Sequence, residues 1–264
     1  MKEYTSATLE EFITAVRNLI IDFHHPNLWW RGQADSKWPL TPGVFRPGYE
    51  KNEQNLSFFF RLKAKSRSAN CPASDTQSPW LFLMQHYGMP TRLLDWTESP
   101  LIALYFAVEN EKENEKDAVI YALQPFNLNF KQCKIESILA PWHPEIAPIF
   151  NEAFNKNETN PDQRIAAIQT DQFDVRHLVQ QSEFTIHGSA KAMEELDGCD
   201  NFLGKIVIPS TAKEHLRVML KVLGITRANL FPDLENLSAE LITLHREKQS
   251  EGSESAEIPH GSHH

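Results

Sequence analysis

The sequence predicts an α+β protein: a single domain with a mixed, mainly antiparallel sheet flanked by helices. Runs rich in β-branched and aromatic residues, typical of strands, occur at residues 28–33, 118–123 and 204–209. Runs with apolar residues at helical spacing occur elsewhere, for example at 9–23 and 55–67. The two kinds of segment do not alternate regularly along the chain, which favours α+β over a doubly wound parallel sheet.

The first predicted element is an amphipathic helix over residues 9–23. Thr8 and Glu11 have the spacing of a capping box, which marks its start. A short aromatic strand at 28–33 follows it and contains Arg31. On the residues alone Arg31 has two readings: it stacks on a neighbouring tryptophan at the surface, or it points into a cleft as a ligand for phosphate or carboxylate.

Residues 83–107 hold the densest polar chemistry in the chain. His86, Arg92, Asp95 and Thr97 lie within twelve positions, among Trp, Tyr, Leu and Phe side chains. Charged groups in so apolar a setting must be paired if they are buried. Two interpretations stay open: this segment is the wall of a site, or Arg92 and Asp95 form a structural buried ion pair.

Glycine and proline place the helix ends around this segment. Gly88 and Pro90 predict the end of one helix, and Ser99 with Pro100 predicts the N-cap and first residue of the next. The residues between them, 91–98, are expected to be extended.

The remaining pattern sets the predicted domain boundaries. A helix after the strand at 204–209 is expected to be capped at Thr211, and a last helix covers 234–244. Residues 1–24 are assigned to the N-terminal helix, 25–247 to the main domain, and 248–264 to a disordered tail. The final residues, 260–264, look like the remnant of a purification tag.

Composition narrows the possible partners. The 264-residue chain has a net charge of −9, which argues against general nucleic-acid binding and against an anionic membrane partner. Three widely spaced cysteines suit reduced thiols, and no apolar run is long enough to span a membrane. We therefore expect a cytoplasmic protein; the oligomeric state is not predicted.

Several familiar catalytic motifs are missing from the sequence. It contains no glycine-rich phosphate loop, no dinucleotide fingerprint, no Gly-x-Ser-x-Gly elbow and no His-Glu-x-x-His. His86, His187 and Asp95 lack the paired spacing of metal ligands, so no metal is predicted. A cleft chemistry assembled from scattered residues stays possible.

The central segment resembles the signature of the FRG domain, a family named for an aromatic-Arg-Gly triplet, here Trp30-Arg31-Gly32. The similar segments are 85–97, 103–107, 180–188 and 230–234, with Ser182 where the family usually has glycine. Together they extend over residues 25–240, nearly the whole chain. The resemblance implies a fold group more firmly than a reaction.

The order of these motifs is also similar to that of ADP-ribosyltransferases, which implies a transferase or glycohydrolase acting on NAD. By that resemblance Arg31 would hold the dinucleotide, Thr97 would shape the nicotinamide pocket, and Glu183 would stabilise an oxocarbenium-like charge. His86 joins Glu183 and Thr97 as a candidate catalytic residue. A nuclease with His86 as general base fits the acidic composition poorly and ranks last.

The alternative is a sensor without catalysis, in which the same cleft holds a nucleotide-like ligand or a protein segment. Aromatic faces would stack on the ligand and arginines would contact its anionic groups. The predicted ligand-binding residues are Trp30, Arg31, Gly32, Tyr87, Arg92, Asp95, Trp96 and Gln181. The resemblance to this family, and no particular residue, suggests an intracellular role in defence or stress.

Overall fold

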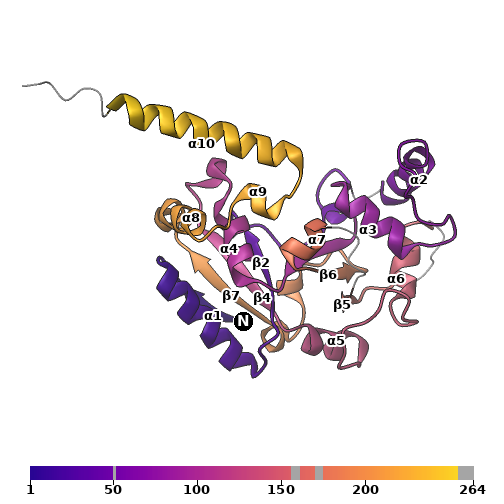
Figure 1. Cartoon of the computed structure of the whole chain (residues 1–264). Helices are drawn as coiled ribbons and strands as arrows, with labels where there is room; N and C mark the ends of the chain where they lie inside the picture. Colours follow the sequence, from indigo (N-terminus) through magenta and orange to yellow (C-terminus); the bar gives the residue numbers. More distant parts are fainter. Residues whose placement is uncertain (50–51, 156–160, 170–174, 255–264) are drawn as a thin grey trace, which may run out of the picture.

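One seven-stranded sheet organises the part of the chain that the computed structural model describes, residues 1–49, 52–155, 161–169 and 175–254. Its order is β1-β7-β4-β2-β3-β6-β5 (Figure 1). β1 is parallel to β7, and the other neighbouring strands are antiparallel, which confirms the predicted α+β class and mixed sheet. The strands are β1 (Lys2–Thr5), β2 (Trp29–Gln33), β3 (Leu93–Thr97), β4 (Ala118–Leu123), β5 (Ile165–Ile168), β6 (Ser182–His187) and β7 (Leu203–Ile208).

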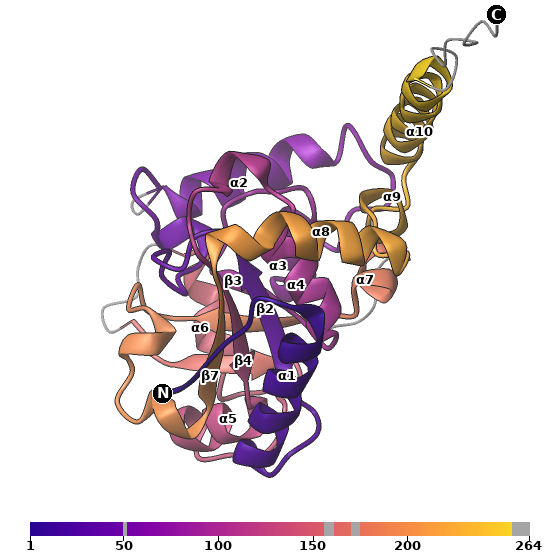
Figure 2. The same ribbon diagram turned by 90° about the vertical axis from the view of Figure 1, so that its left-hand side faces the viewer.

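Two groups of helices cover one face of this sheet. α1 (Leu9–Phe23), α4 (Pro100–Val108) and α8 (Lys213–Val222) pack at the β1 end, while α3 (Ser78–His86) and α6 (Ala147–Glu152) pack at the β5 end (Figures 1 and 2). α5 (Pro125–Cys133) packs through Leu128 on the opposite face. The other helices are α2 (Glu53–Ala64), α7 (Val175–Gln180), α9 (Arg227–Leu230) and α10 (Leu234–Glu254).

The glycine of the Trp30-Arg31-Gly32 triplet lets α4 lie directly on β2. A Cβ atom at Gly32 would be 1.9 Å from the carbonyl oxygen of Ala103 and 2.7 Å from the amide nitrogen of Ala107. The backbone that approaches Gly32 is that of α4. The small residues of α4 therefore fix how close the helix sits to the sheet.

Local signals predicted several helix ends correctly. Thr8 Oγ1 accepts a hydrogen bond from the Glu11 amide at 3.2 Å, and Ser99 Oγ accepts one from the Ile102 amide at 3.4 Å. The cap expected at Thr211 is wrong, because Ser210–Ala212 forms a 3₁₀ turn and the residue before α8 is Ala212, whose side chain caps nothing.

The buried side of α2 is also a correction. The helical spacing of apolar residues over 55–67 predicts that Phe59 lies on the apolar side of this helix, but Phe59 is 53% exposed. The buried residues of α2 are Glu53 and Ser57, which are polar. Polar contacts therefore decide which side of α2 faces the protein.

The C-terminal boundary runs further than expected. α10 continues to Glu254, past residue 247, and the tag-like ending at 260–264 lies outside the described residues. Cys71, Cys133 and Cys199 are all free thiols. Over the ranges described, no helix combines the length and apolarity needed to cross a bilayer.

Candidate functional site

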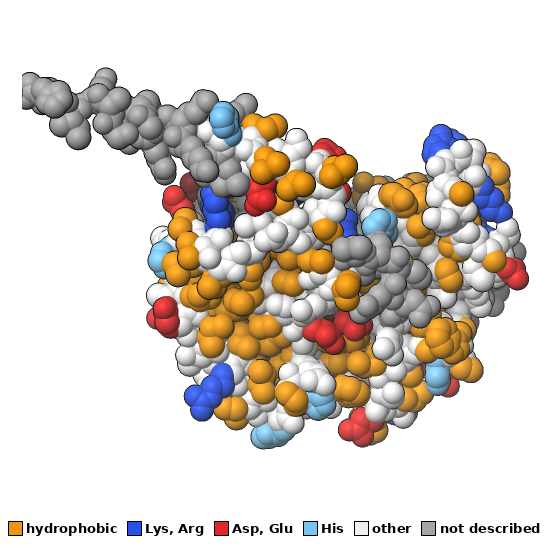
Figure 3. Space-filling model, in the orientation of Figure 1, with side chains coloured by type: hydrophobic (Ala, Val, Ile, Leu, Met, Phe, Trp, Pro, Cys, Tyr) orange, Lys and Arg blue, Asp and Glu red, His pale blue; other side chains and the backbone are white. Residues whose placement is uncertain are grey.

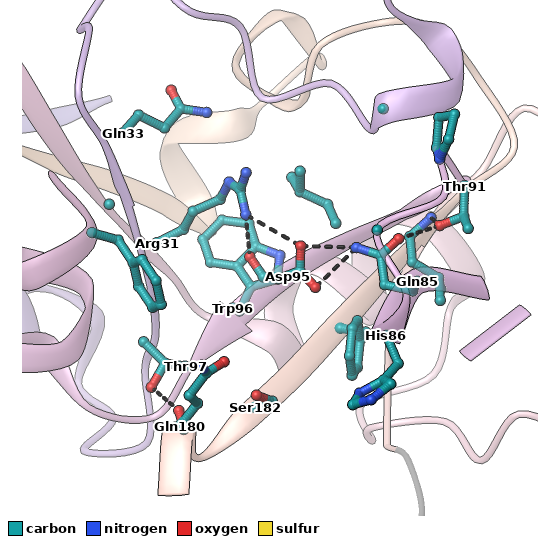
Figure 4. Close-up of a pocket in the computed structure, with 18 of the residues that line it drawn as sticks. Arg31, Gln33, Gln85, His86, Thr91, Asp95, Trp96, Thr97, Gln180 and Ser182 are labelled. Carbon is teal, nitrogen blue, oxygen red and sulfur yellow. Dashed lines mark hydrogen bonds and ion pairs between the residues drawn. The ribbon is translucent and has the colours of Figure 1, made fainter. Parts of the chain in front are cut away.

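A cavity opens where two neighbouring strands separate. β2 and β3 share one registered pair, Trp30 with Thr97, whereas β2 pairs with β4 along all five of its residues. Beyond that pair the strands diverge, and a cavity of about 660 Å³ lies over the gap, between α4 and α3 (Figure 4). The site thus occupies the interval between the two helix groups on that face of the sheet.

Arg31 projects from β2 into this gap. Its NH1 donates to the backbone oxygen of Asp95 at 2.7 Å and lies 3.8 Å from that residue's carboxylate (Figure 4). The side chain is 18% exposed. Burial lowers the pKa of Arg31, and the nearby Arg46 lowers it further against the opposing effect of Asp95. One edge of the guanidinium is therefore anchored to β3, and no described residue pairs with the remaining NH2.

A chain of hydrogen bonds holds the Asp95 carboxylate in the cavity. Thr91 Oγ1 donates to Gln85 Oε1, and Gln85 Nε2 then lies 2.9 Å from each Asp95 carboxylate oxygen. The Asp95 side chain is 54% exposed. Because Gln85 is fixed by Thr91, its amide presents the donor side to Asp95, and the carboxylate keeps lone pairs free for a ligand.

The cavity walls are aromatic, and their charge is opposite in sign to that of the whole chain. Three arginines and two carboxylates line it, which gives a formal charge of +1 in a protein of −9. Arg46 Nε also donates to the Thr41 carbonyl oxygen at 3.1 Å. The charged and aromatic lining residues are Arg31, Arg46, Arg176, Asp95, Glu109, Trp30, Trp38, Tyr49, Trp96, Phe106 and Phe184.

Arg92 does not line the cavity, and of the two interpretations left open for this segment, a buried ion pair between Arg92 and Asp95 is wrong. Arg92 is buried at 4% exposure and binds Glu53 through Nε and NH2, at 2.8 and 2.6 Å. Its NH1 binds Glu152 at 3.1 Å. Burial alone would lower the pKa of Arg92, but the two carboxylates outweigh it and raise the pKa. This clamp joins β3 to α2 and α6.

Most, but not all, of the predicted site residues meet at the cavity. Seven line it: Trp30, Arg31, Gly32, His86, Asp95, Trp96 and Thr97. Besides Arg92, three lie outside it: Glu183, Tyr87 and Gln181. Tyr87 is 65% exposed beside Phe60, and the neighbour of Gln181, Gln180, reaches the cavity in its place.

Thr97 and Trp96 use their polar atoms within the protein. Thr97 Oγ1 donates to the Gln180 carbonyl at 2.7 Å and accepts from the Ser99 amide at 3.1 Å. Trp96 Nε1 donates to Thr185 Oγ1 at 3.0 Å. Both residues therefore shape the cavity and join β3 to its neighbours, and the side-chain donors of both are used within the protein.

Glu183 faces the other side of the sheet. Its neighbours on β6, Ser182 and Phe184, line the cavity, and successive side chains of a strand point to opposite faces. β6 lies between β3 and β5, so it is an interior strand of the sheet. Burial, followed by the nearby Glu98 carboxylate, raises the pKa of Glu183 to about 8. Glu183 itself is not among the residues that line the cavity.

His187 is a buried core histidine. Its Nε2 lies 2.9 Å from Thr185 Oγ1, and burial lowers its pKa to about 3, with Arg31 and Arg92 adding to the effect. His187 and His86 join no cluster of three or more His, Cys, Asp or Glu side chains within the described ranges. The described residues therefore offer no site for a metal.

The order β2-α2-α3-β3-α4 along the chain builds most of this cavity, and residues 26–116 match the family model of the FRG domain. The chain contains an FRG domain. The match includes every cavity residue up to Asn110 and leaves out only those of α7 and β6. Searches of curated proteins and of solved structures gave no match.

Sequence reasoning missed several residues of the FRG domain cavity. Gln85 stands in the quoted signature but carries no charge, so nothing marked it as the residue that holds Asp95. Arg46 follows a Pro-rich loop, and only the fold brings it to the FRG cavity. Arg176 and Gln180 come from α7, far along the chain from the other charged residues of the cavity.

Proposed function

We propose that this FRG domain binds a nucleotide-like ligand in the cavity between β2 and β3. Arg31 carries the proposal: one side of its guanidinium is tied to the Asp95 backbone, and the NH2 group is left for an anion. Planar guanidinium groups suit phosphate and carboxylate. A ligand phosphate therefore binds at Arg31, with Arg46 and Arg176 adding positive charge nearby.

The rest of the ligand is assigned from the walls. The Asp95 carboxylate, held by Gln85, accepts hydrogen bonds from sugar hydroxyls. The aromatic walls provide apolar surface for a base, as in other ligand pockets that combine apolar walls with a few polar groups. A cavity of about 660 Å³ is in the range of small-molecule sites.

Calorimetric titration with NAD, ADP-ribose and ATP tests this proposal. Arg31→Ala should weaken the binding of a ligand about 10–100-fold, because a charge-assisted hydrogen bond to phosphate is lost. Arg17→Ala, an exposed arginine on α1, is the matched control and should leave affinity unchanged. Saturable binding that is equal in wild type and Arg31→Ala would contradict the assignment of Arg31.

Cleavage of NAD is the second candidate, and Asp95 is the observation that favours it. Glu183, the carboxylate expected to act in such a reaction, faces away from the cavity, whereas Asp95 lies in it with an oriented carboxylate. A carboxylate beside a developing ribosyl cation stabilises its charge.

Release of nicotinamide, measured by chromatography, separates cleavage from binding. If the domain cleaves NAD, Asp95→Asn should lower turnover about 10²–10³-fold with binding nearly intact. Glu183→Gln serves as the comparison and should have little effect on turnover. NAD that binds but stays intact in wild type supports the sensor interpretation.

A further inference from the structure

α2 presents a basic and apolar surface to solvent. Phe58, Phe59 and Leu62 are 61%, 53% and 62% exposed. Residues 54–74 contain four Lys and Arg residues and no Asp or Glu. The four are Arg61, Lys63, Lys65 and Arg67, and none forms a salt bridge with any described residue. We call Phe58, Phe59, Leu62 and these four cations the α2 face.

The α2 face also has a recess. Phe58, Leu62 and Phe154 line a groove of about 330 Å³, with Arg61 and Lys65 at its sides. Arg61 is held in place by the rings of Trp80 and Phe154, at 5.6 and 5.2 Å from their centroids. An apolar groove with fixed cations beside it suits an apolar segment that carries acidic residues.

α10 presents the complementary surface. Leu234, Leu237, Leu241 and Ile242 are 83%, 44%, 58% and 51% exposed, in a row along one side of the helix. Residues 232–245 contain three acids, Asp233, Glu235 and Glu240, and no Lys or Arg. We call these leucines, Ile242 and the two glutamates the α10 face. Figure 3 shows apolar side chains exposed on α10 and basic ones at the lobe formed by α2.

The two faces do not meet within one chain. α2 and α10 lie at separate ends of the molecule in both ribbon views (Figures 1 and 2). Each leaves several large apolar side chains in water, which costs free energy in proportion to the exposed area. Their charges are opposite, so either face is a better partner for the other than for itself, because self-pairing would bring like charges together.

We propose that the α10 face of one copy of this chain docks on the α2 face of a second copy. Leu234, Leu237 and Leu241 enter beside Phe58 and Leu62, and Glu235 and Glu240 meet the cations of α2. A two-fold axis makes the contact reciprocal, so that both α10 helices are covered and the assembly closes as a dimer. Residues 43–49, which include cavity residues Arg46 and Tyr49, precede α2 in the chain.

Compensating charge reversals test the docking in the full chain. Sedimentation velocity at about 100 µM chain, where an association of micromolar Kd is nearly complete, should show a dimer for wild type. Lys63→Glu with Lys65→Glu should weaken the dimer about tenfold or more, and so should Glu235→Lys with Glu240→Lys. The four substitutions together should restore much of the affinity, because the signs are opposite again.

Matched controls separate this contact from a general charge effect. Lys112→Glu with Lys191→Glu makes the same change in net charge at exposed sites elsewhere and should leave the dimer intact. Circular dichroism of each variant checks that it is folded. A monomeric wild type overturns the proposal. A dimer that ignores reversal on α2 but responds to reversal on α10 also overturns it, and indicates α10 pairing with itself.

Discussion

The Arg92 guanidinium keeps two carboxylates satisfied in the interior, at 2.6 and 3.1 Å. Removing it leaves Glu53 and Glu152 buried without their partner. Arg92→Met should therefore lower the free energy of unfolding by about 3–5 kcal/mol, the cost of stranding buried charge. Urea denaturation followed by circular dichroism measures this loss.

The control for Arg92→Met is Asp95→Asn. The Asp95 carboxylate is half exposed and 3.8 Å from Arg31, so its loss should cost less than about 1 kcal/mol. If both variants lost a similar free energy of unfolding, the buried ion pairs of Arg92 would contribute no more to stability than the exposed Asp95 carboxylate does.

Glu183 makes stability depend on pH in an identifiable window. Its folded pKa is about 8, above the usual value of 4.5, because of burial and the nearby Glu98. Between these values the folded protein keeps a proton that the unfolded chain releases, so stability falls as pH rises through the window and levels off above it. Glu183→Gln should remove this fall.

Urea midpoints at about pH 5 and about pH 9 measure the effect of Glu183. The difference between Glu183→Gln and wild type should favour the variant more at the higher pH. Glu98→Gln should reduce the pH effect without abolishing it, since burial is the larger cause. An unchanged pH profile in Glu183→Gln would show that this carboxyl is not the group responsible.

At the level of residues, the sequence predicted several residues that line the site. It predicted less well which residues contact one another. Arg31, Asp95 and Thr97 do line one cavity, as their motifs indicated. Arg92 was given the wrong partner because Glu53 and Glu152 are 39 and 60 positions away, and no local pattern indicates such contacts. Glu183 was expected in the site, and it does not line the cavity, although Ser182 and Phe184 on either side of it do.

Among the elements, α4 and β2 show the tightest packing near the site. Gly32→Ala would put a methyl group 1.9 Å from the Ala103 oxygen, and backbone atoms cannot yield as a side chain can. We expect a loss of at least about 3 kcal/mol in the free energy of unfolding, or no folded protein. Thermal and urea unfolding measure it.

Gly43→Ala is the comparison for Gly32→Ala in the same cavity wall. Its Cβ would meet Pro90 at 3.3 Å, a tight contact that a small shift relieves. The cost should stay below about 1 kcal/mol. If Gly32→Ala were as mild, α4 would have to move off β2, and the close packing described above would not be needed for stability.

Elements with strong local signals were predicted well, and those fixed by distant contacts were not. α1 and α4 begin at caps that can be read from sequence, and β4 is apolar throughout because it is central and buried on both faces. α2 has a weak apolar pattern, and the buried Arg92 decides which side faces inward. For such a helix, the deciding contact lies outside its own sequence.

For the whole molecule, local stability should fall from the centre of the sheet to its outlying helices. β4 is buried along its full length between β2 and β7, whereas the apolar side chains of α10 are exposed. In dilute protein, amide hydrogen exchange should be slowest in β4 and β7 and fast in α10. Mass spectrometry of peptides from both regions measures the order.

Concentration distinguishes intrinsic stability from association in that measurement. Raising the chain concentration should slow exchange in α10 and leave β4 unchanged, if α10 docks on a second copy. Slow exchange in α10 at every concentration would contradict the predicted gradient.

The parallel pairing of β1 with β7 has a consequence for synthesis of the chain. Lys2 to Thr5 pair with Gly204 to Val207, so β1 cannot pair until the residues of β7 have been made. A ribosome adding about 5–20 residues per second needs tens of seconds to make the interval between them. Throughout that time the nascent chain holds Lys2–Thr5 without its native neighbour, and α1 can fold long before β1 finds its place. This end of the sheet can therefore be completed only after Gly204–Val207 have been made.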